Sequence, residues 1–374
     1  MKDRPRLLIT MGDVAGIGPE IIAKAWPALN ELCLPVVVGD PAWMRRALRV
    51  ENPNQRVDTV HKIRDPRERQ PGPKTISCLL ASDQDLSQVQ PGKVSAAAGK
   101  AAYDFLCMAI DQTLAGGADG IVTCPLHKEG LRAAGLPYPG HTEILAERTG
   151  TRQFGMLLYA STPALAPACA RASNKVEGRG QGHGQGKDSG GLGVAHVTLH
   201  MALRNIFQHL TCEAVSEKIR LLDGVLAQLL EKNNIRPRIG VAGLNPHAGD
   251  GGLFGDEEER IIAPAVKAAQ VEGLNATGPW PSDTLFVRAC QGEFDGLVVM
   301  YHDQGHIALK LLGGRRAVNI SAGLPIVRTS VAHGTAYDIA GKGIADESSL
   351  VEATRVAALL AERQIANCKL QIDD

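Results

Sequence analysis

The chain has 374 residues, and its 40 basic residues balance 40 acidic ones, so the formal net charge at pH 7 is zero. This length supports a large core, and a usual domain size of roughly 150 residues favours two lobes. The balanced charge does not attract nucleic acid or an anionic membrane surface. No window of about 20 apolar residues predicts a membrane span. We therefore expect a cytoplasmic protein that acts on a small molecule.

Glycine and cysteine usage narrows the class of fold further. Glycine contributes 41 residues, whereas aromatic residues make up only 4% of the chain. This balance is typical of an α/β protein with many tight turns between strands and helices. The eight cysteines are scattered without a CxxC pair, which predicts reduced thiols in a core rather than disulfides or a zinc knuckle.

The first elements of the chain follow a strand, turn and helix order. Residues 7–10 predict a buried strand, and a glycine-rich turn over residues 12–20 leads into a helix that reaches about Trp26. Residues 34–38 predict a second strand, and residues 43–48 predict the helix that follows it. The order predicts an α/β sheet with a helix after each strand.

Further along, three short apolar strands each lead into a polar loop. Ser95 is a candidate N-cap for a long helix that ends near Gly116, and the strands then cover residues 120–123, 239–243 and 296–300. In open α/β sheets, ligands bind where the carboxyl ends of the strands meet. We expect the active site at that edge of the sheet.

One segment departs from this order. Residues 163–193 are rich in glycine, serine, lysine and alanine, and their composition cannot bury apolar surface. We expect a flexible surface insertion there.

Several histidines lie in turns that contain glycine or proline. His141 stands in Pro-Gly-His-Thr-Glu, His247 in Asn-Pro-His-Ala-Gly, and His302 with Asp303 in Tyr-His-Asp-Gln-Gly. Neutral imidazole suits zinc, cobalt or manganese, and a neighbouring carboxylate serves as a ligand or an orienting group. Because these histidines form no local motif such as HExxH, the residues alone leave both metal binding and a structural role open.

Basic residues and a glycine-rich turn are the remaining chemical signals. Arg328 ends an apolar run and precedes a loop of small residues, which favours contact with a phosphate or carboxylate, whereas Arg315 and Arg316 lie in a glycine turn typical of an exposed surface. The turn over residues 12–20 contains GxG near a helix start. It lacks the full GxGxxG pattern, so a structural turn and a phosphate-binding turn both remain open.

Five motifs in the chain resemble those of one known family. They are Thr-Met-Gly-Asp-x-Ala-Gly-Ile-Gly-Pro-Glu at 10–20, Pro-Gly-His-Thr-Glu at 139–143, Asn-Pro-His-Ala-Gly at 245–249, Tyr-His-Asp-Gln-Gly at 301–305 and Gly-Leu-Pro-x-x-Arg-Thr-Ser at 323–330. The chain resembles the 4-hydroxythreonine-4-phosphate dehydrogenases of vitamin B6 (pyridoxine) biosynthesis, including the branch that acts on D-threonate or D-erythronate 4-phosphate. The resemblance runs from about Leu7 to Ala357, apart from the insertion.

The resemblance implies a fold and an assembly. The expected fold is α/β and isopropylmalate-dehydrogenase-like, with two α/β lobes around a central cleft in a single catalytic unit. We place the lobes at residues 1–135 with 310–374, and at 136–309. The family also implies a homodimer whose metal site is completed across the interface.

The resemblance also implies roles for particular residues. The expected metal ligands are His200, His247 and His302, with His302 supplied by the partner subunit. Asp283 and Asp303 are candidates for proton transfer or for orienting a ligand, and the general base is left unassigned. The expected substrate contacts are His141, Thr142, Lys310, Asn319 and Arg328.

The implied reaction is an oxidation followed by decarboxylation of a small phosphorylated hydroxy acid, with NAD or NADP and one divalent metal, zinc, magnesium or cobalt. His306, in the run Gly-His-Ile-Ala-Leu-Lys, favours the threonate and erythronate branch. The alternatives are a dehydrogenase of aromatic dicarboxylate dihydrodiols and a non-catalytic metal- or phosphate-binding homologue. An acyl transferase like the phosphotransacetylases is less favoured, because it has no need of three converging histidines.

Overall fold

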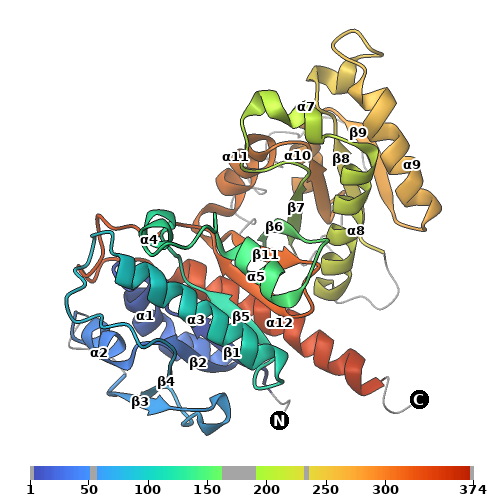
Figure 1. Cartoon of the computed structure of the whole chain (residues 1–374). Helices are drawn as coiled ribbons and strands as arrows, with labels where there is room; N and C mark the ends of the chain where they lie inside the picture. Colours follow the sequence, from blue (N-terminus) through green and yellow to red (C-terminus); the bar gives the residue numbers. More distant parts are fainter. Residues whose placement is uncertain (1–3, 51–56, 162–190, 231–235, 371–374) are drawn as a thin grey trace, which may run out of the picture. The chain divides into compact units, whose positions relative to one another are not determined.

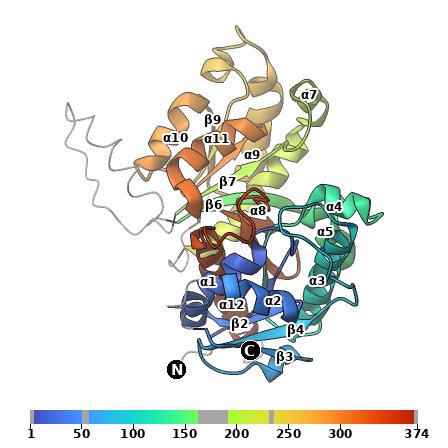
Figure 2. The same ribbon diagram turned by 90° about the vertical axis from the view of Figure 1, so that its left-hand side faces the viewer.

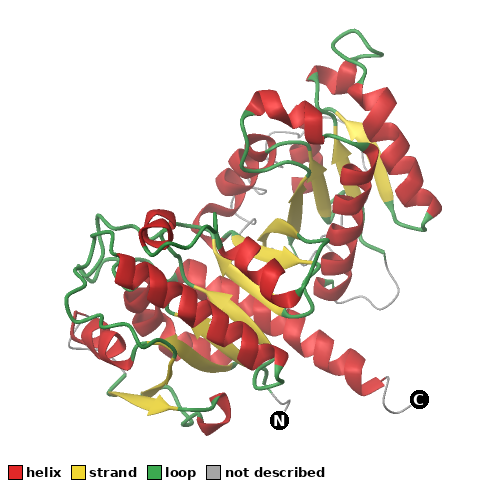
Figure 3. Ribbon diagram, in the orientation of Figure 1, coloured by secondary structure: helices red, strands yellow, loops and turns green. Residues whose placement is uncertain are grey.

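The computed structural model describes residues 4–50, 57–161, 191–230 and 236–370. The chain forms two compact units, Met1–Gln153 with Leu324–Asp374, and Phe154–Gly323. Helices and strands alternate in both, so the fold is α/β as predicted (Figure 1, Figure 3). The predicted lobes differ from these units in two segments. Residues 136–153 belong to the first unit and residues 310–323 to the second, whereas the prediction placed each in the opposite lobe. That the units are two lobes around a cleft stays a prediction.

The first unit is built on a parallel sheet. Its strands lie in the order β3-β4-β2-β1-β5-β12, and every neighbouring pair is parallel. Valine, isoleucine and leucine fill the central strands, which are buried on both faces as is usual for parallel sheets. The strands are β1 (Arg6–Thr10), β2 (Leu34–Gly39), β3 (Thr59–Ile63), β4 (Thr75–Leu80), β5 (Gly120–Thr123) and β12 (Val327–Val331).

Helices cover both faces of this sheet. Figures 1 and 2 show α3 on one face, and α1 and α12 on the other. Each connection between parallel strands is a right-handed crossover. When successive crossovers proceed toward opposite edges of the sheet, their helices lie on opposite faces. The helices are α1 (Gly18–Leu32), α2 (Pro41–Val50), α3 (Ala96–Leu114), α4 (Lys128–Ala133), α5 (His141–Thr149), α12 (Ser348–Leu370) and the short 3₁₀ turn η1 (Pro66–Glu68).

The structure confirms most of the elements predicted in this unit. The strand over residues 120–123 has the predicted bounds, and Ser95 accepts a hydrogen bond from the amide of Ala98 as the N-cap of α3. Helix α1 is longer than predicted, because it continues through Pro27 to Leu32. Burial of its apolar face, which includes Trp26 and Leu29, outweighs the hydrogen bond that proline removes.

The second unit has a mixed sheet in the order β11-β6-β7-β10-β8-β9. Strand β6 is antiparallel to both of its neighbours, and the remaining pairs are parallel. Of the insertion predicted over about residues 163–193, residues 163–190 lie outside the described residues, and β7 begins at Leu192, just before its predicted end. The strands are β6 (Gly155–Ala160), β7 (Leu192–His196), β8 (Ile239–Ala242), β9 (Ala276–Trp280), β10 (Gly296–Val299) and β11 (Val318–Ala322).

Helices also cover both faces of the second sheet. Helices α8 and α9 lie on one face, with α10 and α11 on the other (Figure 1). A buried apolar cluster that includes Leu158, Val194, Leu285, Leu297 and Leu309 packs beneath α10 and α11. The helices are α7 (Ile206–His209), α8 (Cys212–Leu229), α9 (Ala263–Val271), α10 (Ser282–Cys290) and α11 (His302–Gly313), with the 3₁₀ turns η2 (Leu203–Asn205), η3 (Pro246–Gly249) and η5 (Gly314–Arg316) and the π-helical turn η4 (Glu258–Ile262).

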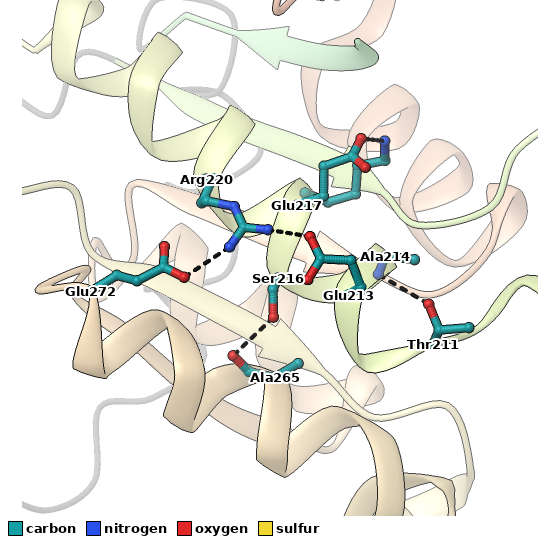
Figure 4. Close-up of polar contacts among 9 residues, drawn as sticks. Thr211, Glu213, Ala214, Ser216, Glu217, Arg220, Ala265 and Glu272 are labelled. Atoms are coloured by element: carbon teal, nitrogen blue, oxygen red, sulfur yellow. Dashed lines mark hydrogen bonds and ion pairs between the residues drawn. The ribbon is translucent and has the colours of Figure 1, made fainter. Parts of the chain in front are cut away.

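Polar contacts fix α8 at its start and against α9 (Figure 4). Thr211 caps α8 by accepting a hydrogen bond from the amide of Ala214 at 3.1 Å. Arg220 donates to Glu213 on its own helix at 2.6 Å and to Glu272, just beyond α9, at 2.8 Å. These pairs are exposed, so we assign them a modest role beside the packing of the two helices.

The structure bears on two predictions made from composition, one about membrane spans and one about the cysteines. Within the described ranges, no helix is both long enough and apolar enough to cross a membrane. Cys33, Cys78, Cys107 and Cys124 are buried thiols outside any disulfide, as predicted. Burial raises the pKa of Cys33 to about 12, so that thiol stays protonated at neutral pH.

Candidate functional site

Three loops of the second unit leave the same edge of its sheet. His196 is the last residue of β7 and lies opposite Val299 of β10, and His302 follows Val299 by three residues. The loop after β8 carries His247. Because β7, β10 and β8 are adjacent and parallel, their carboxyl ends coincide, as the sequence predicted.

His302 begins helix α11 and is oriented by its neighbour. Its Nδ1 lies 2.7 Å from Oδ1 of Asp303, and both side chains are partly exposed to solvent. An imidazole that donates from Nδ1 to a carboxylate keeps a lone pair on Nε2. The contact is of the kind expected of an orienting carboxylate, and the role of Asp303 stays a prediction.

His200 lies close to His302 in the same unit. Their ring centroids are 5.7 Å apart, and both residues line a pocket of about 650 Å³. Tyr301 and Asp303 add polar groups to the pocket, and Leu199, Met201, Ala202, Leu203 and Ile206 add its apolar part. The structure thus places His200 and His302 of one chain at the same pocket, whereas the predicted metal site takes His302 from the partner subunit, and that pairing stays a prediction.

Two further histidines pack behind His302. The ring of His306 stacks on that of His302 with centroids 3.9 Å apart and an interplanar angle of 11°. Nδ1 of His306 lies 3.0 Å from Nε2 of His196, and both residues are buried. Burial lowers the pKa of His196 to about 3 and that of His306 to about 4, so both rings are neutral at pH 7.

His247 stands in a separate loop with a left-handed backbone. Its φ is +53°, and its ring lies 6.4 Å from that of Phe254. Within the described residues, no three histidine, cysteine or acidic side chains are grouped closely enough to hold a metal. The three-histidine ligand set therefore stays a prediction.

Gln304 ties these loops together, although the sequence reasoning assigned it no role. Its Nε2 donates to the carbonyl of Gly243 at 2.8 Å and to the hydroxyl of Ser282 at 2.7 Å. Its Oε1 accepts from the amide of Met300 at 2.6 Å. One side chain thereby fixes the loop after β8, the start of α10 and the start of α11. In the sequence, its position inside the Tyr-His-Asp-Gln-Gly motif was the feature that could have indicated a role for Gln304.

The other predicted residues of this unit lie at defined positions. Asp283 is exposed in the first turn of α10, and Lys310 is exposed in the last turn of α11. Asn319 lies on β11 opposite Leu158 of β6. The charge of Lys310 adds to burial in lowering the pKa of His306.

In the first unit, a second cluster gathers at the ends of β5 and β12. Arg328, on β12, is 3% exposed, and its guanidinium donates to Oγ1 of Thr123 at 2.6 Å. His141 begins α5, followed by Thr142, and hydrogen-bonds to the backbone of Cys124. The structure thus places predicted substrate contacts from two distant motifs together.

The electrostatics of this second cluster favour an anion. Burial and, after it, the charge of Arg328 hold the pKa of His141 well below its ordinary value, so the imidazole is neutral at pH 7. Burial lowers the pKa of Arg328 to about 10, against the opposing charge of Glu143, and the guanidinium stays protonated. A buried cation beside a neutral hydrogen-bonding ring is suited to phosphate or carboxylate oxygens.

The glycine-rich turn is locked to two other loops of the first unit. Gly12 has a φ of +67°, and a Cβ there would lie 2.3 Å from the carbonyl oxygen of Pro125. Asp13 is fully buried and accepts from the hydroxyl of Tyr337 at 2.8 Å, and the ring of Tyr337 stacks on His127 with centroids 4.6 Å apart. Burial raises the pKa of Asp13. These contacts account for the turn structurally.

The sequence comparisons agree with this geometry. Residues 31–357 match the family model described as "Pyridoxal phosphate biosynthetic protein PdxA". A 4-hydroxythreonine-4-phosphate dehydrogenase of Beijerinckia indica is 44% identical over 364 residues, covering 96% of each chain. A D-threonate 4-phosphate dehydrogenase of Cupriavidus necator is 42% identical over 369 residues, covering 96% of this chain and 98% of the relative.

A solved structure is similar over nearly the same span. The crystal structure of 4-hydroxythreonine-4-phosphate dehydrogenase from Klebsiella pneumoniae superposes with a TM-score of 0.79 at 39% identity. The match covers 96% of this chain and 99% of that one. The likeness therefore includes the elements that carry both clusters.

Proposed function

Because the chain belongs to the family of the pyridoxal phosphate biosynthetic protein PdxA, we propose that it is a dehydrogenase that uses NAD or NADP to oxidise a phosphorylated hydroxy acid. The substrate is 4-hydroxythreonine 4-phosphate or a close relative, D-threonate or D-erythronate 4-phosphate. Relatives named for the first and second of these are 44% and 42% identical to the chain, so a substrate assay must include both. The protein works in the cytoplasm, and its fold is isopropylmalate-dehydrogenase-like.

The observation that carries this proposal is the cluster around Arg328. The Arg328 guanidinium is buried, donates to Thr123 and lies beside a neutral His141, and the nearby charge of Glu143 helps to keep it protonated. A phosphorylated hydroxy acid offers both a phosphate and a carboxylate to such a group. We therefore assign His141, Thr142 and Arg328 as substrate contacts, and we add Lys310 and Asn319 on the strength of the family motifs alone.

We further propose that His200, His247 and His302 bind one divalent metal, with His302 supplied by the partner subunit of a homodimer. The donor set fits zinc or cobalt, because imidazole nitrogens suit these ions better than magnesium, which prefers oxygen ligands. The hydrogen bond from His302 Nδ1 to Asp303 leaves Nε2 for the metal. The three-histidine set leaves room for substrate oxygens.

Exposed apolar side chains around the pocket support the homodimer. Leu203 is 64% exposed and Phe207 is 57% exposed, and both lie on the segment that follows His200. Leu253 and Phe254, in the loop after His247, are also exposed. Apolar side chains concentrated beside a site are typical of a surface that a partner covers.

The chemistry follows from what each residue holds in place. A metal held by the histidines would lower the pKa of the substrate hydroxyl, and a bound nicotinamide would take up the hydride. Arg328 fixes an anionic end of the substrate, and neutral His141 gives or receives one hydrogen bond. Asp303 orients His302, and Asp283 is left as a candidate for proton transfer. The oxidised β-keto acid then loses carbon dioxide.

The decisive experiment measures NADH or NADPH formation by the purified protein with zinc, cobalt or magnesium. The three candidate 4-phosphates are offered in parallel, together with an aromatic dicarboxylate dihydrodiol. Turnover of one phosphate ester that chelation and the variant His247→Ala both abolish supports the proposal. A folded, metal-loaded protein that is inert toward every substrate supports the non-catalytic alternative instead.

A further inference from the structure

Around His247, three residues that are not glycine have a left-handed backbone conformation. His247, Ala248 and Asp250 have φ values of +53°, +55° and +46°. None is a glycine, and a non-glycine residue in the left-handed region costs free energy that the surrounding structure must offset. The loop therefore needs a strong external restraint to hold its shape.

Glu258 supplies that restraint through both of its carboxylate oxygens. Oε1 accepts hydrogen bonds from the backbone amides of Leu244 and Asn245, each at 2.7 Å. Oε2 accepts from the side-chain amide of Asn245 at 3.0 Å. All three donors belong to the two residues that precede Pro246 and His247, so the carboxylate fixes the point where the loop leaves β8.

The loop wraps closely around this carboxylate. A Cβ at Gly249 would lie 2.8 Å from Oε2 of Glu258, and one at Gly243 would lie 3.1 Å from Oε1. A side chain at Gly249, whose φ is +83°, would collide with the carboxylate, and one at Gly243 would crowd both the carboxylate and Ala248. The two glycines that flank His247 in sequence therefore fit the same restraint.

The Glu258 carboxylate is unusual because it is buried and is held by hydrogen bonds. Glu258 is 3% exposed, and no ion pair joins it to a lysine or arginine in the part of the chain that the structure describes. A buried carboxylate without a cation is costly unless hydrogen bonds satisfy it, and here the loop supplies all of them. Glu258 also begins a π-helical turn, a feature that is frequent at functional sites.

We propose that Glu258 is a positioning residue for His247, holding the loop over residues 244–250 in the shape that presents the imidazole to a divalent metal. This inference rests on the proposed metal site. It assigns Glu258 no contact with substrate, cofactor or metal. Its effect is on the conformation of the loop, and through it on metal affinity.

The test compares Glu258→Gln with the neighbouring Glu259→Gln. The first keeps the size of the side chain but removes the charge and puts an amide group where Asn245 donates. The second removes one charge from an exposed side chain on the same turn. Full-length proteins are stripped with a chelator and titrated with Co(II), and binding is followed by visible absorption.

We expect Glu258→Gln to weaken Co(II) binding by about 10- to 100-fold, the usual effect of removing a group that orients a ligand. We expect Glu259→Gln to bind within about twofold of the wild type. Excess Co(II) should restore NADH formation by Glu258→Gln, which a general folding defect does not allow. Wild-type affinity in Glu258→Gln, or no recovery at saturating metal, overturns the inference.

Two other outcomes are also informative. If neither the wild type nor Glu259→Gln binds Co(II), the proposed metal site fails, and the inference fails with it. If Glu258→Gln does not fold, Asn245→Ala replaces it, because that variant removes the side-chain bond to Glu258 Oε2, together with one to Glu257, and keeps both backbone bonds to Glu258 Oε1. We expect a loss of affinity of severalfold there, and wild-type affinity overturns the inference.

Discussion

Replacing Gly305 by alanine is expected to destabilise the protein, although alanine favours helices more than glycine does. Gly305 lies in helix α11, where a Cβ would stand 2.4 Å from Nε2 of His196 and 2.8 Å from methyl carbons of Val194 and Val299. Carbon atoms pack at about 3.5–4.0 Å, so the helix or the buried His196 must move by about 1 Å. Such a move disturbs the stacked pair His302 and His306.

The size of the effect follows from two opposing contributions. Overpacking a buried site costs about 1–3 kcal/mol, and three contacts below 3.0 Å place Gly305 at the upper end of that range. The gain in helix propensity from glycine to alanine is about 1 kcal/mol. We therefore expect Gly305→Ala to lower the free energy of unfolding by about 2 kcal/mol.

Gly224 provides a matched control on another helix. It lies in α8, is exposed, and a Cβ there would have no atom within 4 Å. Gly224→Ala should raise the free energy of unfolding by about 0.5–1 kcal/mol. Urea unfolding of the metal-free proteins, followed by circular dichroism, measures both changes. A Gly305→Ala variant at least as stable as the wild type refutes the close packing of α11 against β7.

Three further outcomes are expected. Arg328→Met should lower kcat/KM for the phosphorylated substrate by about 10- to 100-fold, since a charged hydrogen bond is lost, and leave Co(II) affinity unchanged; an unaltered kcat/KM argues against the substrate contact. Between pH 6.5 and about 4 the unfolded chain binds a proton at His306 that the folded chain does not, because burial lowers the pKa of His306 in the fold to about 4. Between pH 6 and 5, the metal-free wild type should therefore lose about 1 kcal/mol more stability in urea unfolding than His306→Phe, and equal losses contradict this. Chelation should abolish NADH formation and lower the melting temperature measured by calorimetry, and Co(II) at 100 times its Kd should restore about 2.7 kcal/mol; an unchanged melting temperature shows that no structural metal was bound.

Much of the fold could be predicted from periodicity and turn residues. The strands over residues 7–10, 120–123 and 296–300 were found because each is a short apolar run bounded by glycine or charged residues. Strands β3 and β4 fall in a polar stretch where the sequence indicated no element. Their register comes from pairing with each other and with β2, a long-range contact that a local pattern does not contain.

The candidate site was predictable in its motifs but not in the contacts that hold it. His302 and His247 stand in recognisable turns and Arg328 at the end of an apolar run, and the motifs alone pointed to them. Several of the contacts around them join residues far apart in sequence: Arg328 donates to Thr123, which is 205 residues away, and His196 and His306, behind His302, are 110 residues apart. Such pairs depend on strand order, which local residue patterns do not encode.

This difference explains why Gln304 and Glu258 gained a role only from the structure. Each is an ordinary polar residue inside a recognisable segment, and each becomes unusual through its burial or its partners. Gln304 joins three loops because β8 and β10 are neighbours, and Glu258 faces the amides after β8 because a π-helical turn brings it there. The sequence therefore identifies the side chains suited to the chemistry. The fold identifies the residues that orient them. Variants of those orienting residues should therefore lower metal affinity more than they lower the turnover of the metal-loaded enzyme.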